Sequence, residues 1–407
     1  MLVMEMSNKK QQIPAIRFNG FTDAWEQRKL GDIAEIKTGP FGSTLHAEDY
    51  VQSGIPIITT EHFKSGHLPE SKDGTPQVSD EDYSRLKSYI LKKGDIVFSR
   101  VGSVDINALV TTLQDGWLFS GRVLRVRSQN QIDSDYLHYL LDTLPVKNDI
   151  VSRAVGQTMP SINTEILKST KLVLSKNIEE QELIAGTLRK LDDTLALHQR
   201  KLTLLEQLKQ SYLQLMCPQN KGNIPALRFA GFSEPWEQRK IRELFTVTRG
   251  QVLAATKTKD KETNNFIYPV YSSQTKNNGL MGFYDQYLFE NAITWTTDGA
   301  NAGTVNFRKG KFYSTNVNGV LLSDKGFANK AISEIINKIA WKHVSKVGNP
   351  KLMNNVMSEI TVTIPFVEEQ NKLSLLFEQL DDTIDLHKCM LDKLLELKLV
   401  FLRKMFL

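Results

Sequence analysis

The sequence predicts an α+β protein in which two β-rich α/β domains are separated by an antiparallel two-helix coiled-coil spacer and related by a pseudo-twofold axis. Three observations predict this architecture. One stretch of sequence occurs near the start of each half, a second stretch occurs near the end of each half, and the segments between them are unlike. A duplicated frame that holds two different inserts accounts for all three.

The duplicated stretches are recognisable by eye. The first begins at Ile13 as IPAIRFNGFTDAWEQRKL and returns at Ile224 as IPALRFAGFSEPWEQRKI. The second begins at Ile178 as IEEQELIAGTLRKLDDTLALHQRKLTLLEQL and returns at Val367 as VEEQNKLSLLFEQLDDTIDLHKCMLDKLLEL. The second pair of copies lies closer together than the first, so the insert of the second half is shorter. The predicted segments are a first domain with its repeat at 13–175, a central helix at 176–223, a second domain with its repeat at 224–364, and a C-terminal helix at 365–407 that pairs with the central helix.

Each second stretch carries apolar residues spaced alternately by four and three, which is the heptad pattern of helices that pack on each other. The predicted seam consists of Ile184, Leu188, Leu191, Leu195, His198, Leu202, Leu205, Leu373, Phe377, Leu380, Ile384, His387, Leu391 and Leu394. Helices of about 30 residues span roughly 45 Å. Chain order places one insert near each end of an antiparallel pair, and the same symmetry places the N-terminal IPAIRF segment near the end of the C-terminal helix.

His198 and His387 occupy equivalent seam positions. A metal or catalytic role needs further Cys, His or carboxylate partners at suitable spacing, and none is visible. A buried polar residue that fixes helix register is the alternative interpretation, and the one we favour. Four Asp residues precede these histidines and are interpreted as a solvated helix face rather than as catalytic carboxylate pairs: Asp192, Asp193, Asp381 and Asp382.

Composition indicates a folded protein that is only mildly basic. The 407 residues contain 51 Lys and Arg against 46 Asp and Glu, which permits a polyanionic partner without requiring one. No stretch reaches the roughly 20 apolar residues of a membrane helix, and the first residues lack a long apolar run and a cleavage site. We therefore expect a cytoplasmic protein. Cys217 and Cys389 lie far apart and belong to no Cys or His cluster, so neither a disulfide framework nor a structural zinc site is expected.

The inserts consist of short apolar runs separated by Gly, Asn, Asp and Ser, which is typical of β-rich domains. DIVFSRVGSVDINALV and GWLFSGRVLRVR in the first insert, and NAITWTTDGANAGTVNF and GKFYSTNVNGVLL in the second, predict strands. Setting Gly102 against Gly299 and Gly116 against Gly310 aligns these pairs approximately, so the inserts are expected to share a fold.

Residues that can read nucleic acid lie in the loops and turns of both inserts. Arg can bond the edge of guanine twice, Asn and Gln can do the same with adenine, and Lys attracts phosphate. Each residue alone is also compatible with an ordinary turn or strand surface. The candidate DNA-binding residues are Ser99, Arg100, Ser103, Arg122, Arg153, Gln157, Gln274, Lys276, Asn277, Asn301, Arg308, Asn316 and Asn318.

Sequence motifs for catalysis are absent. The chain has no GxxxxGK[ST] phosphate loop, no GxGxxG dinucleotide loop, no GxSxG elbow and no HExxH helix. Asn349, Pro350 and Lys351 approach the Asn/Asp-Pro-Pro-aromatic motif of adenine methyltransferases but lack its second Pro and its aromatic residue. We expect no catalytic residue and no metal site in this chain.

The duplicated RFxGFxxxWEQRK segments, the two EEQ-plus-leucine helices and the divergent inserts together resemble the specificity subunits of type I restriction-modification systems. The resemblance covers essentially the whole chain. It implies that each insert is a target recognition domain for one half of a bipartite, asymmetric sequence in double-stranded DNA, and that the helices set the gap between the halves. It also implies that two methyltransferase subunits dock on the repeated regions, that restriction and translocase subunits join for cleavage, and that S-adenosylmethionine, ATP and Mg²⁺ belong to those partners.

Several alternatives stay open at the level of sequence. The chain is alternatively a non-catalytic assembly scaffold, a specificity protein that serves a methylation-only complex, or a self-contained methyltransferase. Trp25 and Trp236 are interpreted as anchors at the helix junctions rather than as platforms for stacked bases. Apolar residues outside the predicted seam are covered either by partner helices or by the inserts: Leu183, Leu197, Leu204, Leu386 and Leu395.

Overall fold

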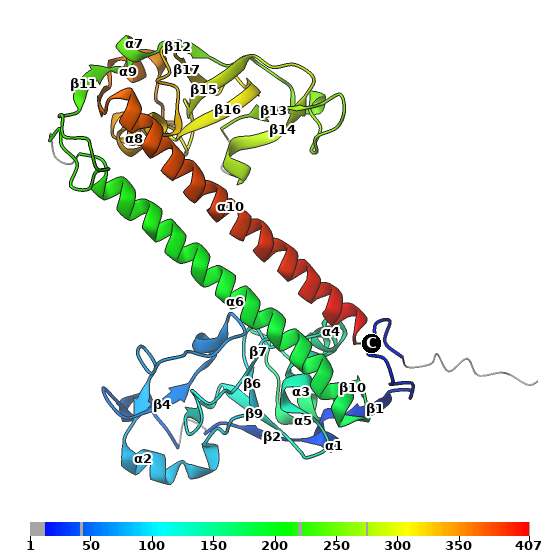
Figure 1. Cartoon of the computed structure of the whole chain (residues 1–407). Coiled ribbons are helices and arrows are strands. Elements are labelled where there is room, and N and C mark those ends of the chain that lie inside the picture. The colour runs from blue at the N-terminus through cyan, green and yellow to red at the C-terminus, as the bar shows by residue number, and fades with distance from the viewer. Residues whose placement is uncertain (1–12, 41–43, 219–221, 274–275, 407) are drawn as a thin grey trace, which may run out of the picture. The chain divides into compact units, whose positions relative to one another are not determined.

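The computed structural model describes residues 13–40, 44–218, 222–273 and 276–406 and divides the chain into two compact units (Figure 1). Unit 1 contains the chain up to Leu197 together with the residues from Met390 onward, and unit 2 contains His198–Cys389. Helix α6 (Ile178–Leu215) begins in unit 1 and ends in unit 2, whereas α10 (Val367–Lys404) begins in unit 2 and ends in unit 1. The domain boundaries given above, which treat each helix as a segment of its own, stay a prediction.

Unit 1 contains three small sheets. One is the antiparallel sheet β2-β9-β6-β7, formed by β2 (Ala34–Thr38), β9 (Val123–Ser128), β6 (Asp95–Ser99) and β7 (Asn107–Leu109). The second has the order β3-β5-β4-β8, with β3 (Tyr50–Val51), β5 (Gln77–Val78), β4 (Ile55–Ile58) and β8 (Leu118–Phe119), and its β4–β8 pair is parallel. The third pairs β1 (Glu26–Lys29) with β10 (Lys171–Leu174).

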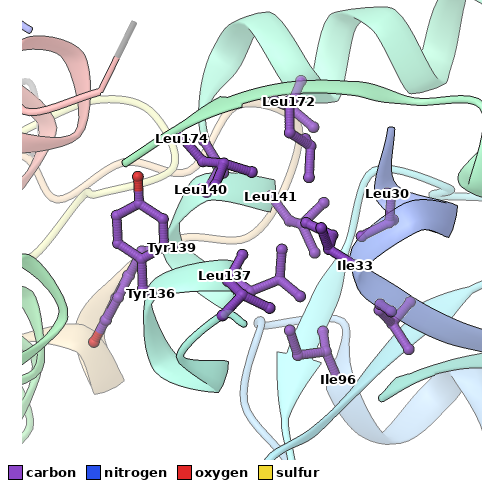
Figure 2. Close-up of a cluster of buried hydrophobic side chains, with 14 of the residues drawn as sticks. Leu30, Ile33, Ile96, Tyr136, Leu137, Tyr139, Leu140, Leu141, Leu172 and Leu174 are labelled. Atoms are coloured by element: carbon purple, nitrogen blue, oxygen red, sulfur yellow. The ribbon is translucent and has the colours of Figure 1, made fainter. Parts of the chain in front are cut away.

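The short helices of unit 1 are α1 (Leu30–Ile33), α2 (Asp80–Arg85), α3 (Ser134–Leu141), α4 (Leu144–Ser152) and α5 (Thr164–Lys168). Of these, α3 packs against β6, β7 and β9, and α5 packs against β2. Figure 2 shows part of the core, to which α3 contributes Leu137, Leu140 and Leu141 and α1 contributes Leu30 and Ile33. Asp133 begins α3 because its carboxylate accepts a hydrogen bond from the Tyr136 backbone N–H, 2.8 Å away.

Unit 2 repeats the same plan with one continuous six-stranded sheet of order β12-β17-β15-β16-β13-β14. Its strands are β12 (Thr246–Arg249), β17 (Asn318–Leu322), β15 (Phe289–Thr296), β16 (Val305–Ser314), β13 (Tyr268–Tyr271) and β14 (Leu280–Tyr284). A separate pair joins β11 (Glu237–Lys240) to β18 (Thr361–Ile364). The helices are α7 (Ile241–Leu244), α8 (Lys330–Ala340) and α9 (Asn354–Glu359). The expectation that both inserts are β-rich and share a fold is confirmed. The strand order β12-β17-β15-β16 matches β2-β9-β6-β7, and the long strand β16 corresponds to both β7 and β8 of unit 1.

A buried carboxylate explains why the two repeated stretches occur together. Glu180, in the first turn of α6, accepts two hydrogen bonds from the Arg17 guanidinium, at 2.5 and 3.0 Å, and one from the Trp25 indole at 3.2 Å. In unit 2, Glu369 accepts the same three bonds from Arg228, at 2.8 Å each, and from Trp236 at 3.1 Å. Trp25 and Trp236 are both 3% exposed, so the interpretation of these residues as anchors at the helix junctions is confirmed.

The glutamine of each EEQ motif connects its helix to the chain around it. The Gln181 side-chain amide donates to the Ser175 carbonyl oxygen at 2.8 Å, and its oxygen accepts from the Asp133 backbone N–H at 2.9 Å. Gln370 likewise donates to the Pro365 carbonyl oxygen at 2.7 Å, and its oxygen accepts from the Asn329 side chain at 2.9 Å. Asp133 and Asn329 stand at the starts of α3 and α8, so each glutamine holds the start of a long helix against the start of a shorter helix in the same unit.

Segments of α6 and α10 pair within each unit. In unit 2 the Nδ1 atoms of His198 and His387 lie 2.7 Å apart, and Lys209 reaches Asp381 at 2.7 Å, so the two segments run antiparallel there. In unit 1, Lys398 pairs with Asp192 at 2.6 Å. All fourteen residues of the predicted seam are buried or half-buried.

The aspartates beside the histidines divide into two kinds. Asp193 and Asp382 are exposed, as expected of a solvated face. Asp192 and Asp381 are half-buried and carry ion pairs, and Asp192 also accepts a hydrogen bond from the Tyr139 hydroxyl at 2.8 Å. The interpretation of a solvated face is therefore wrong for these two residues, because Tyr139 of α3 contacts Asp192 and Lys330 of α8 contacts Asp381.

Both repeated N-terminal segments begin at the end of a long helix. The Ile16 N–H donates to the Lys404 carbonyl oxygen at 2.8 Å, and the Leu227 N–H donates to the Leu215 carbonyl oxygen at 2.9 Å. The expected place of the IPAIRF segment, near the end of the C-terminal helix, is confirmed. Within the described part of the chain, no helix is both long and apolar enough to cross a membrane.

Candidate nucleic-acid interface

Three of the candidate DNA-binding residues of unit 1, Ser99, Ser103 and Arg122, line one cavity of about 230 Å³ at the carboxyl end of β6. Arg100 is not in its lining, and its guanidinium donates to the Gly121 carbonyl oxygen at 3.1 Å. Ser103 and Arg122 are exposed, whereas Ser99 is buried and donates to the Val101 carbonyl oxygen. The rest of the lining is Thr60, Glu61, Phe63, Lys64, Val101, Gly102, Ile106 and Met159.

Arg153 and Gln157 lie away from this cavity lining. Arg153 donates to the Ile166 carbonyl oxygen and the Ser169 hydroxyl, each at 2.8 Å, and to the Thr170 hydroxyl at 2.6 Å. These bonds hold the end of α4 against α5, so the visible contacts of Arg153 are structural. Gln157 is exposed in the turn that follows.

In unit 2, Asn301, Arg308 and Asn318 line a second cavity, of about 120 Å³, at the carboxyl end of β15. The other lining residues are Ser272, Asn278, Gly279, Thr294, Thr296, Thr304 and Asn306. Asn301 donates to the Ser273 carbonyl oxygen at 3.1 Å. Burial lowers the pKa of Arg308 to about 10, and the ring of Tyr271 lies 3.8 Å from its guanidinium carbon.

The remaining candidates of unit 2 are dispersed. Asn277 and Asn316 are exposed, and neither lines the cavity. Lys276 begins a short 3₁₀ turn, and only the backbone of this residue is described. Gln274 lies outside the described residues.

The two cavities lie at adjoining places in the repeated fold, since matching backbone hydrogen bonds pair Ser99 and Ile106 of the first lining with Thr296 and Thr304 of the second. Gly102 and Gly299 both donate to the carbonyl oxygen of a proline, Pro160 or Pro350, so their alignment is confirmed. Four further bonds of unit 1 have a counterpart in unit 2. Written with the N–H donor first and the carbonyl acceptor second, Arg100–Arg122 matches Thr297–Val317, Gly39–Val123 matches Gly250–Asn318, Ser120–Ile58 matches Thr315–Tyr271, and Ile162–Arg100 matches Leu352–Thr297. By the same strand registers, the structural counterpart of Gly116 in unit 2 is Lys311, one residue away from the predicted counterpart Gly310.

Close backbone approach helps to form both cavities. A Cβ on Gly39 would lie 2.1 Å from the Ser120 carbonyl oxygen, and a Cβ on Gly250 would lie 2.2 Å from the Thr315 carbonyl oxygen. Neither side chain can fit, so glycine is required at this point of β2 and β12. The first strand of each sheet therefore passes tightly against the turn that carries Arg122 or Asn318.

Several lining residues were missed from the sequence, including Thr294, Thr296 and Asn306. Their signal is alternation: on β15 and β16 the polar residues stand at every second position, and strand geometry turns those positions to one face. Thr60 and Lys64 of unit 1 carry no comparable signal. They lie at a short 3₁₀ turn after β4, and only the tertiary fold brings them to the cavity.

The apolar residues outside the predicted seam are exposed on α6 and α10, so the inserts do not cover them: Leu183, Leu197, Leu204, Leu386 and Leu395. Further exposed apolar side chains lie on the same helices, including Leu375 and Leu399. Among the described residues, no three His, Cys, Asp or Glu side chains are grouped as a metal site requires.

Comparison with known proteins identifies the family. The family model described as type I restriction modification DNA specificity domain matches twice, over residues 22–207 and 233–396. One relative, the N-terminal part of a type I specificity subunit of Mycoplasma pneumoniae, is 34% identical over 142 residues, which cover 34% of this chain and 74% of the relative. The specificity subunit of the type I restriction enzyme MpnII from the same organism is 32% identical over 158 residues, covering 38% of this chain and 46% of that one.

The fold is also similar to that of a solved structure, the S subunit of a type I restriction-modification system from M. genitalium. The TM-score is 0.70 at 15% sequence identity, and the match covers 97% of this chain and 99% of the other. The two family matches follow the two halves of the duplicated frame and together span most of the chain. The chain therefore belongs to the family of type I restriction-modification specificity subunits.

Proposed function

We propose that the chain is the non-catalytic specificity subunit of a type I restriction-modification complex and reads a bipartite, asymmetric DNA sequence, one half through each unit. The observation that supports this most directly is a pair of cavities at adjoining positions of the shared frame with unlike linings. A shared frame gives both units the same way of approaching DNA, and different side chains give them different half-sites.

The helices α6 and α10 are, in this proposal, an antiparallel coiled-coil spacer that sets the gap between the two half-sites. Repeated half-sites on one face of DNA lie about 34 Å apart, or multiples of it. A helix of 38 residues such as α6 spans roughly 57 Å, which is long enough for that separation.

Two methyltransferase subunits dock on the repeated regions in the same proposal. Exposed leucines recur at related places on α6 and α10, and helices of a partner would remove them from water. Because the frame is duplicated, one docking surface occurs twice. In this proposal S-adenosylmethionine, ATP and Mg²⁺ bind to the partner subunits, which in the full complex include restriction and translocase subunits.

Exchange of one insert tests the function. Residues 246–358 are replaced by the corresponding segment of another family member, and the variant is purified with its methyltransferase. Methylated adenines are then mapped across a genome. One half of the recognition sequence should change and the other half should stay the same, because each unit has its own sheet and core.

A changed sequence in both halves would contradict the modular interpretation. A continuous or palindromic wild-type sequence would contradict the bipartite one, and loss of sequence selectivity in the wild-type complex would favour an assembly scaffold. Native mass spectrometry of the same complex should record two methyltransferase subunits per chain, and a single copy would contradict the duplicated docking surface.

A further inference from the structure

A small apolar cluster in unit 1 has a polar counterpart in unit 2. The unit 1 cluster lies between β4, β6 and β9 and includes Val97, Ala108 and Val123, all 0% exposed. The strand registers and backbone hydrogen bonds that relate the two units assign a counterpart to six members of this cluster. The six pairs are Ile58 and Tyr271, Val97 and Thr294, Ala108 and Asn306, Val110 and Arg308, Phe119 and Ser314, and Val123 and Asn318.

Every aliphatic or phenyl side chain of these six positions in unit 1 is therefore replaced by a group that carries polar atoms in unit 2. Four of the replacements, Thr294, Asn306, Arg308 and Asn318, line the unit 2 cavity. Burial of polar groups without full hydrogen bonding lowers stability, whereas the unit 1 arrangement shows that the same frame accepts a packed apolar cluster. Stability alone thus favours the unit 1 residues at these positions.

Two buried polar atoms beside the unit 2 cavity have no hydrogen-bond partner in the described part of the protein. Asn318 is 2% exposed, and neither its Oδ1 atom nor the Ser314 hydroxyl has a hydrogen-bond partner among the described residues. Arg308 is 7% exposed and donates from Nε to the Thr294 hydroxyl at 3.1 Å. Within the described part of the chain, no carboxylate forms an ion pair with Arg308.

The corresponding face of unit 1 provides a contrast. It also holds a buried arginine, Arg125, whose Nε has no partner among the described residues, but there Glu35 accepts a hydrogen bond from the guanidinium at 2.6 Å. Buried arginines in proteins are normally paired in this way. Arg308 therefore has the donors, and Asn318 the acceptor, of a site that is completed from outside the chain.

The size and chemistry of the cavity limit what can complete it. A cavity of about 150 Å³ holds one benzene molecule, so about 120 Å³ admits a group no larger than a single six-membered ring. A phosphate presents acceptors to Arg308 but no donor to the Asn318 oxygen. The edge of a nucleobase carries acceptors and donors side by side and satisfies both.

We propose that the unit 2 cavity binds one pyrimidine base turned out of the DNA stack, with Arg308 and Asn318 reading its edge. This inference rests on the proposed function, since it requires that unit 2 contacts DNA. Arg308 and Asn318 are only 7% and 2% exposed, so a base held within an intact duplex cannot reach them. Extrusion breaks one base pair, and the contacts inside the cavity compensate for that loss.

The test uses the complex of the whole chain with its methyltransferase and the recognition sequence found by methylation mapping. An abasic residue is placed, in turn, opposite each base of that sequence, which leaves the base itself in place but unpaired. Unpairing the methylated adenines should also tighten binding, because the methyltransferase turns those bases out for its own reaction. Apart from these, binding should tighten by about tenfold at one position of one half-site, because the cost of breaking that pair is removed, and it should be unchanged or weaker elsewhere.

The variant Arg308→Val/Asn318→Val carries the unit 1 residues and is expected to fold, because unit 1 packs the same residues in the same frame. It should lose the tightening and about tenfold of discrimination at that one base pair, the value of one good base contact. Asn316→Val is the matched control, since Asn316 is exposed on the same turn and does not line the cavity. It should bind as the wild type does.

Two results would overturn the inference while the proposed function stands: selective binding of the wild type in which no position other than the methylated adenines tightens, or tightening at such a further position that persists in the double variant. Binding by the wild-type complex without any sequence selectivity would instead refute the proposed function itself.

Discussion

Glu180 and Glu369 are the residues on which the duplicated sequence depends. Each is a carboxylate with 0 or 1% exposure, and each accepts hydrogen bonds from an arginine and a tryptophan of the preceding repeat. The partners of Glu180 are more than 150 residues away in sequence, since Arg17 and Trp25 precede the first insert. The insert can therefore change freely as long as its two ends return to this carboxylate.

Substitution of Glu180→Gln should destabilise unit 1 by about 3 to 5 kcal/mol, because it leaves the Arg17 guanidinium buried without its counter-charge. Urea unfolding followed by circular dichroism gives the midpoint. The matched control is Glu179→Gln, since Glu179 is exposed beside it and should change stability by less than about 0.5 kcal/mol. Equal midpoints for the two variants would show that the carboxylate does not hold the junction.

At the scale of elements, local sequence patterns predict the long helices well. Their heptad spacing gives each helix one apolar stripe, and Asn177 starts α6 by accepting a hydrogen bond from the Glu179 backbone N–H at 2.8 Å. The pattern does not give the contact between His198 and His387. That contact exists because the antiparallel register brings equivalent positions of the two repeats opposite each other.

The histidine pair allows a double-mutant test. With Nδ1 atoms 2.7 Å apart, one ring donates and the other accepts, so His387→Leu alone leaves the His198 nitrogen half-buried without this partner. The single variant should lose about 1 to 3 kcal/mol, whereas His198→Leu/His387→Leu should recover most of the loss, because two leucines pack in the seam. Urea unfolding of the four proteins measures the coupling. Additive losses would mean that the rings do not interact.

At the scale of the whole molecule, the chain is two copies of one plan. Each unit contains the end of one long helix and the start of the other; unit 2 is one continuous stretch of sequence, whereas unit 1 is formed from both ends of the chain. The proposed spacer role of α6 and α10 leads to a test of length.

Insertion of one heptad into both helices, after Lys201 and at the equivalent point after Met390, should widen the gap between the two half-sites. Seven residues add about 10 Å to a helix, which corresponds to about 3 base pairs of DNA. Methylation mapping reads the gap directly. Insertion in only one helix is the control and should disrupt the pairing, since the two seams then lose register. An unchanged gap in the doubly extended protein would mean that the helices do not set the spacing.

The candidate site was predicted less completely than the fold. Arg308, Asn301 and Asn318 were selected from the sequence as residues able to read bases, and the structure gathers them at one cavity. Arg153 was selected on the same grounds, yet its donors are bonded to α5. Side-chain type states what a residue can bond, whereas the neighbours that occupy those bonds come from other parts of the chain.

The sequence by itself determined the duplication, the α+β class, the two long helices and the divergence of the inserts, because repeats, heptads and strand alternation are patterns of neighbouring residues. Only the tertiary structure decided that Arg17 forms an ion pair with Glu180, that the leucines outside the seam of α6 and α10 stay exposed, and that unit 2 has a polar cavity where unit 1 has an apolar cluster. These features join positions far apart in the chain, and their energies depend on burial and distance, which folding alone establishes.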